Sequence, residues 1–148
     1  MKTILLAATL LSAAPALAAP KTIFTCKLGA KAATVTLDGS RFTYRYGTPK
    51  KTELTVVGTA SNLHAYSGRY ASILSQLRFN VGEVSYIVYA MGASSVADSS
   101  AVSGLMVVRG SKLLSDKSCK PVAEFKGGYN AMMELPQDED KWSSMSLE

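Results

Sequence analysis

Hydrophobic and polar residues alternate with a period of two along most of the chain, from Thr22 to Leu114. Successive side chains of a strand point to opposite faces of a sheet, so this alternation is typical of half-buried strands. In Arg41–Tyr46, three aromatic residues alternate with two arginines and a threonine, which directs the aromatic residues toward a core. The strands predicted in this way are Thr22–Lys27, Ala33–Leu37, Arg41–Tyr46, Glu53–Val57, Leu74–Asn80, Val84–Met91, Gly104–Arg109 and Lys112–Leu114.

Residues that favour turns separate the predicted strands. Asp38-Gly39 is a clear signal, because both residues tolerate the positive φ of a tight hairpin. Asn62–Tyr70 is interpreted as a loop, and so is Gly92–Ser103, which is rich in Ser, Ala and Gly. Short strands at regular spacing favour an all-β fold, a small antiparallel β-barrel or sandwich of about seven to eight strands.

The N-terminal segment Met1–Ala18 has the three parts of a secretory signal peptide. Lys2 supplies a positive charge, Ile4–Leu11 is a short apolar run, and Ala16-Leu17-Ala18 is a cleavage site of the A-x-A kind. The run is shorter than the roughly 20 residues that a membrane-spanning helix needs. We therefore expect cleavage after Ala18, a periplasmic or secreted protein, and no transmembrane segment in the mature chain.

The mature chain is expected to form a single β domain over Ala19–Leu135. Beyond it, the acidic segment Pro136–Glu148 has little apolar content, and we expect a disordered tail because such a segment does not offset the entropy of ordering it. Trp142 is the aromatic exception in this tail. The sequence leaves open whether Trp142 docks on the domain.

Cys26 and Cys119 are the two cysteines of the chain. Export to an oxidising compartment favours pairing of an even number of cysteines. A bond between them would close a long loop and contribute on the order of 4 to 5 kcal/mol in the simplest entropic treatment. The sequence therefore predicts one structural disulfide.

Charge is distributed unevenly along the chain. Ala19–Met133 carries fourteen Lys and Arg against six Asp and Glu, whereas Glu134–Glu148 carries five acids and one lysine. A basic body either serves solubility alone or favours anionic partners, such as a phospholipid, an anionic glycan or an acidic protein cleft. Because no recognition helix or RNA-binding aromatic signature is present, the sequence predicts no nucleic-acid partner.

Candidate catalytic groups are few. His64 is the only histidine, and histidine is the usual general base near neutral pH. The sequence contains no G-x-S-x-G nucleophile elbow, no glycine-rich phosphate loop and no zinc-ligand spacing. It therefore predicts that the protein is not an enzyme and needs no cofactor or metal ion.

A series of short motifs between Phe24 and Cys119 resembles a group of small exported bacterial proteins of unassigned function. These motifs are Phe24-Thr25-Cys26-Lys27, Phe42-Thr43-Tyr44-Arg45-Tyr46-Gly47, Glu53-Leu54, Gln76-Leu77-Arg78-Phe79-Asn80, Tyr86-Ile87-Val88-Tyr89 and Gly104-Leu105-Met106-Val107-Val108-Arg109. More distantly, the chain is similar to the periplasmic lysozyme inhibitors of the membrane-bound and periplasmic C-type kind, which are small disulfide-linked β-barrels.

In those inhibitors, a serine-glycine motif with a tyrosine three places after the glycine enters the enzyme cleft. Ser67-Gly68-Arg69-Tyr70 is the matching segment here, with its tyrosine one residue earlier. The second motif of the family, a tyrosine followed by a threonine-lysine-glycine run, is absent.

The sequence predicts a non-catalytic periplasmic binding protein. The resemblance implies an inhibitor or immunity protein for a periplasmic or secreted cell-wall hydrolase, whose cleft carries acidic side chains that a basic loop can occupy. The alternative is an envelope module that binds an anionic glycan or lipid, or has a structural role. The residues predicted to contact the partner are Arg41, Arg45, His64, Tyr66, Ser67, Arg69 and Tyr70.

Overall fold

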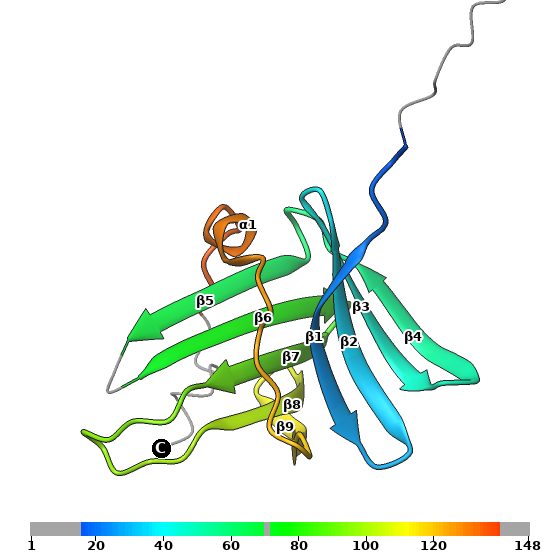
Figure 1. Ribbon diagram of the computed structural model, residues 1–148. Coiled ribbons are helices and arrows are strands. Elements are labelled where there is room, and N and C mark those ends of the chain that lie inside the picture. The colour runs from blue at the N-terminus through cyan, green and yellow to red at the C-terminus, as the bar shows by residue number, and fades with distance from the viewer. Residues whose placement is uncertain (1–15, 70–71, 140–148) are drawn as a thin grey trace, which may run out of the picture.

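The computed structural model describes residues 16–69 and 72–139 (Figure 1). Most of the predicted signal peptide, residues 1–15, lies outside the described residues, as do Tyr70 and the end of the predicted tail, residues 140–148 with Trp142. No helix in the described part of the chain is long and apolar enough to cross a membrane.

The described residues form nine antiparallel strands and one short helix. These are β1 (Lys21–Leu28), β2 (Lys31–Asp38), β3 (Arg41–Thr48), β4 (Lys51–Val57), β5 (Leu63–Arg69), β6 (Ile73–Val81), β7 (Val84–Met91), β8 (Val102–Arg109), β9 (Lys112–Ser118) and α1 (Tyr129–Met133). Strands β1–β4 form the first sheet and β5–β9 the second, each in sequence order. The predicted all-β class is therefore confirmed.

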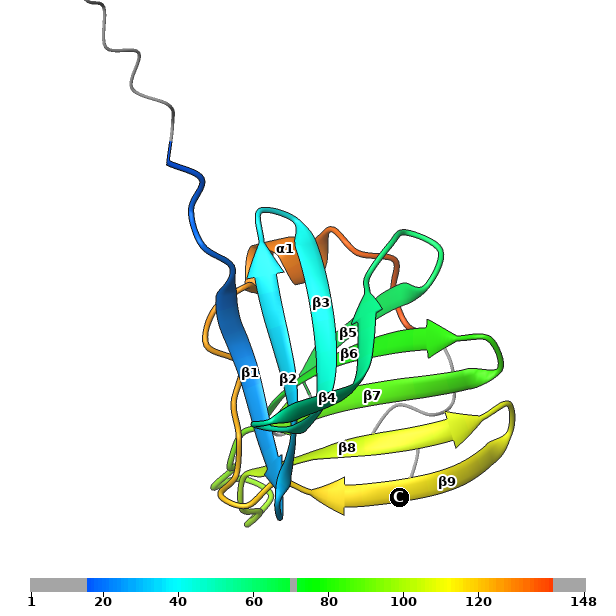
Figure 2. The same ribbon diagram turned by 90° about the vertical axis from the view of Figure 1, so that its right-hand side faces the viewer.

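The two sheets remain open and cross at a steep angle, so the fold is the sandwich of the two predicted alternatives (Figure 2). Their inner faces enclose a core in which Phe42 and Tyr44 point inward, as the alternation in β3 predicts. The ring of Tyr44 lies 5.5 Å from that of Phe79 and 5.6 Å from that of Tyr86, measured between centroids. Burial raises the pKa of Tyr44 above its ordinary range.

Strand β5 corrects the interpretation of Asn62–Tyr70 as a loop. Leu63–Arg69 pairs with β6 along its whole length, and its Leu63 and Ala65 side chains are buried in the core. The alternation is weak in this segment because Ser67 and Gly68, which have low β-propensity, follow these two apolar residues. The tertiary pairing with β6 decides the conformation.

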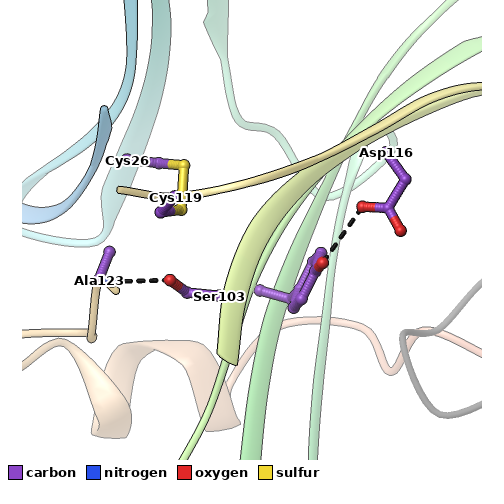
Figure 3. The surroundings of a disulfide bond; sticks show 6 residues. Cys26, Ser103, Asp116, Cys119 and Ala123 are labelled. Carbon is purple, nitrogen blue, oxygen red and sulfur yellow. Dashed lines mark hydrogen bonds between the residues drawn. A yellow bond between two sulfur atoms is a disulfide. The ribbon is translucent and has the colours of Figure 1, made fainter. Parts of the chain in front are cut away.

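The predicted disulfide is confirmed. Cys26 in β1 and Cys119 directly after β9 are bonded, with their Cα atoms 4.9 Å apart (Figure 3). Beside this bond, the N–H of Ala123 donates a hydrogen bond of 2.7 Å to Oγ of Ser103 in β8. The disulfide thus joins the edge of the first sheet to the end of the second.

The chain after the disulfide runs along the edge strand β1. The N–H of Lys120 donates to the carbonyl of Lys27, and the N–H of Lys126 donates to the carbonyl of Ile23, so this segment is antiparallel to β1. Phe125 from the same segment packs in the core. These contacts cover an edge that would otherwise present unpaired backbone groups.

The predicted disordered tail is ordered at its start, which corrects the boundary at Pro136. The N–H of Ala65 donates to the carbonyl of Pro136, and the N–H of Asp138 donates to the carbonyl of Ala65, so residues 136–138 lie parallel to the edge strand β5. Asp138 is only 6% exposed and forms an ion pair with Arg78. The acidic composition of this segment predicts disorder on the assumption that its acids are solvated, whereas Asp138 is paired in the interior.

Candidate functional site

A groove of about 1050 Å³ lies between the second sheet and the chain segment that follows the disulfide. In Figure 1 the wall of the groove is the orange segment that crosses in front of β5, β6 and β7. Residues of the floor are Ser67, Ile73, Ser75, Ala90, Met91, Gly92 and Ala101, and residues of the wall include Val122, Ala123, Phe125, Tyr129, Met132 and Met133. The groove thus has a floor formed mainly by the second sheet and a wall formed by irregular chain and α1, and residues of β1 also line it.

A row of small side chains crosses the floor of the groove. Ser67 pairs with Ser75, Ser75 with Ala90, and Ala90 with Ser103, so one row of small residues crosses β5, β6, β7 and β8. Farther along the same inner face, Phe79 and other large side chains fill the space between the sheets. The groove therefore forms where the residues of the inner face become small.

Apolar side chains form an exposed rim around the groove. Ile73, Val122, Tyr129 and Met133 are between 49% and 74% exposed, although each is a large hydrophobic residue. Contiguous exposed apolar groups beside a concave surface commonly mark a ligand or interaction site. We define these four residues as the apolar rim.

Cations stand at both ends of the wall. Lys27 lies where the wall begins, beside Lys120, and Lys126 lies where the wall reaches Ile23. Glu124 is the one acidic residue that lines the described groove. The groove therefore combines an apolar interior with a small excess of positive charge at its edge.

His64 does not line the groove that holds the serine hydroxyls. Ser67 faces the groove, whereas His64 is three positions away on β5 and therefore points to the opposite face of the sheet. In residues 16–69 and 72–139, no three histidine, cysteine or carboxylate side chains come together as a metal site would require. The groove offers shape, apolar surface and charge for binding.

The structure does not bring the sequence-predicted partner-binding residues together. Arg41 and Arg45 are exposed on the outer face of the first sheet, roughly 13 Å apart along β3 at the usual rise per residue. His64 and Tyr66 lie on the outer face of the second sheet, and Ser67 lines the groove. The predicted set is therefore distributed over three surfaces.

Two members of that set are described only in part or not at all. Arg69 is the last residue of β5, and its side chain is outside the described structure. Tyr70 lies outside the described residues. The Ser67-Gly68 pair that carries the resemblance to lysozyme inhibitors is therefore part of a strand, with Ser67 at the groove.

Sequence reasoning missed the groove because its wall comes from residues 121–133, which show no period of two or of 3.6. The floor left a signal in the sequence. Ser75 and Ala90 are small, whereas most other inward positions of β6 and β7 hold large apolar residues. A small residue at an inward position leaves space unfilled unless a neighbouring side chain occupies it. The meeting of these positions across strands depends on register, which one sequence does not specify.

Comparison with protein-family models, with curated proteins and with solved structures found no match for this chain. The choice of ligand class therefore depends on the chemistry of the groove itself. That chemistry is apolar in the interior and cationic at the edge.

Proposed function

We propose that this chain is a non-catalytic binding protein whose groove holds a lipid with an apolar chain and an anionic head group. The observation that carries this proposal is the open groove of about 1050 Å³ with its apolar rim. Small-molecule sites commonly have volumes of roughly 300 to 1,000 Å³ and mostly apolar walls with a few polar groups. This groove is of that size and composition.

An apolar ligand chain would cover the apolar side chains of the groove that are otherwise exposed to water. The exposed side chains of Val122 and Met133 on the wall face a floor that contains Ile73 and Ala90. Burial of apolar surface contributes about 0.8 kcal/mol for each methylene removed from water. A ligand chain of several methylenes therefore supplies enough free energy to offset the cost of its immobilisation.

The anionic head group follows from the charges at the edge. Lys27 and Lys126 are exposed at the two ends of the wall, and the body of the protein is basic as a whole. Exposed cations attract an anion over several ångströms, with a strength that salt reduces. The same lysines would exclude a cationic amphiphile.

Inhibition of a cell-wall hydrolase, which the sequence and its resemblance predict, is a separate proposal that uses a different surface. It would place an acidic cleft against Arg41 and Arg45, on the outer face of the first sheet. Because neither Arg41 nor Arg45 lines the groove, substitutions at these arginines and substitutions in the groove test the two proposals separately. The groove supports lipid binding better, since it unites apolar and cationic groups in one concave site.

The first experiment measures binding of saturated fatty acids of increasing length, from decanoate to hexadecanoate, by displacement of a fluorescent fatty-acid probe. We expect affinity to rise by about tenfold for each added pair of methylenes until the groove is full, because each buried methylene contributes about 0.8 kcal/mol. A glycan fragment or an uncharged sugar should not displace the probe. Affinity that does not depend on chain length would contradict the proposal.

Matched variants locate the site. Ser67→Phe places a large ring on the groove floor, whereas Thr55→Phe places the same ring on β4, away from the groove; both parent residues are exposed. We expect Ser67→Phe to weaken hexadecanoate binding at least tenfold and Thr55→Phe to leave it unchanged. Equal effects of the two variants would remove the groove from consideration.

The charge variants test the head group. Lys27→Glu with Lys126→Glu should weaken binding of hexadecanoate but leave binding of its uncharged amide nearly unchanged. Lys112→Glu in β9, an exposed lysine away from the groove, is the control. Arg41→Glu with Arg45→Glu should not affect either ligand, and loss of capture of a cell-wall hydrolase in this variant would instead support the inhibitor proposal.

A further inference from the structure

The second sheet is apolar on its outer face as well as on its inner face. Leu74 in β6, Ile87 in β7, and Met106 and Val108 in β8 form a cluster with Tyr89, separate from the core between the sheets. Register places these residues on the same side, since Ile87 pairs with Met106 and the alternation of each strand directs them away from the first sheet. We define these five residues as the outer cluster.

The outer cluster is buried, although no described element lies over most of it. Ile87 and Met106 are 0% exposed, and Leu74 and Val108 are 1% exposed. In Figures 1 and 2, β1–β4 and the segment between β9 and α1 all lie on the inner side of the second sheet. An uncovered sheet face would leave such side chains in contact with water.

The last described residues lead the chain onto this face. Residues 136–138 lie beside β5, and Asp138 then reaches over β5 to Arg78, whose Nε donates to its Oδ2 at 2.7 Å. Nε2 of Gln76 donates to the same oxygen at 2.8 Å. Gln76 and Arg78 are the neighbours of Leu74 along the outward positions of β6.

We infer that the C-terminal segment, residues 140–148, docks across β6, β7 and β8 and covers the outer cluster. Nine residues follow Glu139, and nine extended residues span roughly 30 Å. The path from β5 to β8 crosses three strand spacings, about 15 Å in total. The segment is therefore long enough, and Trp142, Met145 and Leu147 supply the apolar side chains that the outer cluster needs.

The buried ion pair fixes where this segment begins. Asp138 and Arg78 have side chains that are 3% and 5% exposed, and a buried pair tolerates little displacement because separating two opposite charges in the interior is costly. Asp138 therefore acts as the anchor from which residues 140–148 extend over the outer cluster. This inference does not rest on the proposed function, because none of the five residues of the outer cluster lines the groove.

Trp142 provides a direct test, because it is the only tryptophan of the chain. In the full-length native protein, we expect its fluorescence emission at shorter wavelength than in the urea-unfolded protein, with acrylamide quenching reduced several-fold. Both properties should persist on dilution, since the segment and the face belong to the same chain. Emission and quenching equal to those of the unfolded chain would overturn the inference.

A pair of variants connects the fluorescence to the outer cluster. Val108→Lys introduces a cation into the cluster and should move Trp142 emission to longer wavelength and raise quenching, whereas Val57→Lys, on an exposed position of β4, should leave both unchanged. A circular dichroism spectrum with native β content shows that each variant is folded, and an unfolded Val108→Lys is replaced by Val108→Thr. Unchanged emission in the folded variant, or a blue shift that disappears on dilution because a second copy covers the face, would overturn the inference.

Discussion

The two sheets of the sandwich differ in how many of their faces are buried. The first sheet is one-sided, with Phe42 and Tyr44 inward and Arg41 and Arg45 exposed on its outer face. The second sheet is apolar on both faces in β6, β7 and β8. The first sheet therefore needs packing partners on its inner face only. The second sheet needs a separate packing partner for each of its two faces.

The apolar residues of the second sheet are almost fully buried on its outer face, whereas part of its inner face remains open. Its outer cluster is almost fully buried, whereas the row of small residues on its inner face borders an open groove. A binding protein of the proposed kind needs one open apolar site, and other exposed apolar faces would favour aggregation. The open end of the inner face is therefore the site to which we assign a ligand.

Ion pairs should show the largest difference between the two sheets. Removal of the buried partner by Asp138→Ala should lower the free energy of unfolding by about 3 to 5 kcal/mol, because the buried Arg78 guanidinium loses the carboxylate that accepts a hydrogen bond from its Nε. Glu53→Ala, which removes the exposed pair with Lys31 in the first sheet, should cost less than about 1 kcal/mol. Urea unfolding of both variants measures the two values.

The double variant Arg78→Met with Asp138→Leu sharpens this comparison. Replacement of both charges by apolar groups should recover much of the loss, because both members of this buried pair are removed together. A loss in the double variant as large as in Asp138→Ala would show that the segment after α1, and not the charge, is responsible.

The disulfide should have the next largest effect, because it joins the two unlike sheets at one end. Replacement of both Cys26 and Cys119 by Ser should lower stability by roughly 2 to 5 kcal/mol. Urea unfolding is again the measurement, and the wild type under reducing conditions is the control. Two reactive thiols in the native, unreduced protein would contradict the assignment.

A smaller effect should separate the outer faces of the two sheets. Ile87→Val removes one methylene from the outer cluster and should cost about 0.5 to 1.5 kcal/mol. Thr55→Val, a substitution on the exposed outer face of the first sheet, should change stability by less than about 0.5 kcal/mol. Equal effects would mean that the outer face of the second sheet is as solvated as that of the first.

The smallest effect is expected at alkaline pH. Burial and the negative charge of Asp116, which accepts a hydrogen bond from the Tyr89 hydroxyl, raise the pKa of Tyr89 from 10.0 to about 12 (Figure 3). Below pH 10 the neutral phenol keeps its full stabilising effect. Between pH 10 and 12 the unfolded chain loses this proton first, so stability falls as pH rises.

Tyr89→Phe should therefore flatten the decline of the unfolding free energy between pH 10 and 12, relative to Tyr46→Phe in β3. Urea unfolding at a series of pH values measures the decline. An unchanged slope in Tyr89→Phe would show that this phenol titrates alike in the folded and unfolded chains.

The sequence predicts the first sheet better than the second for a physical reason. One-sided strands such as β3 alternate in the sequence as they do in space. In β7, Ile87 and Tyr89 are apolar at outward positions, and such a run indicates burial on both faces without showing what supplies the second cover. Strand β9 extends to Ser118, beyond the predicted end at Leu114. The prediction stopped early because the residues after Leu114 are polar and lie at the edge of the sheet.

The candidate site is less predictable than the fold. Small residues such as Ser75 and Ala90 form a groove floor only when strand register aligns them in one row. The wall of the groove depends on the disulfide and on hydrogen bonds of irregular chain to β1, and neither produces a periodic pattern. Surface arginines, by contrast, are conspicuous in the sequence, but Arg41 and Arg45 do not line the groove.

The most direct test of the central claim is an NMR titration of the isotope-labelled protein with hexadecanoate. The groove assignment predicts that the largest backbone chemical-shift changes occur at Ala90, Ala101 and Val122, which line the groove. Arg41 and Arg45 in β3 should not shift. The absence of shifts, or shifts centred on β3 or on the outer cluster, would contradict the claim that the groove is the ligand site.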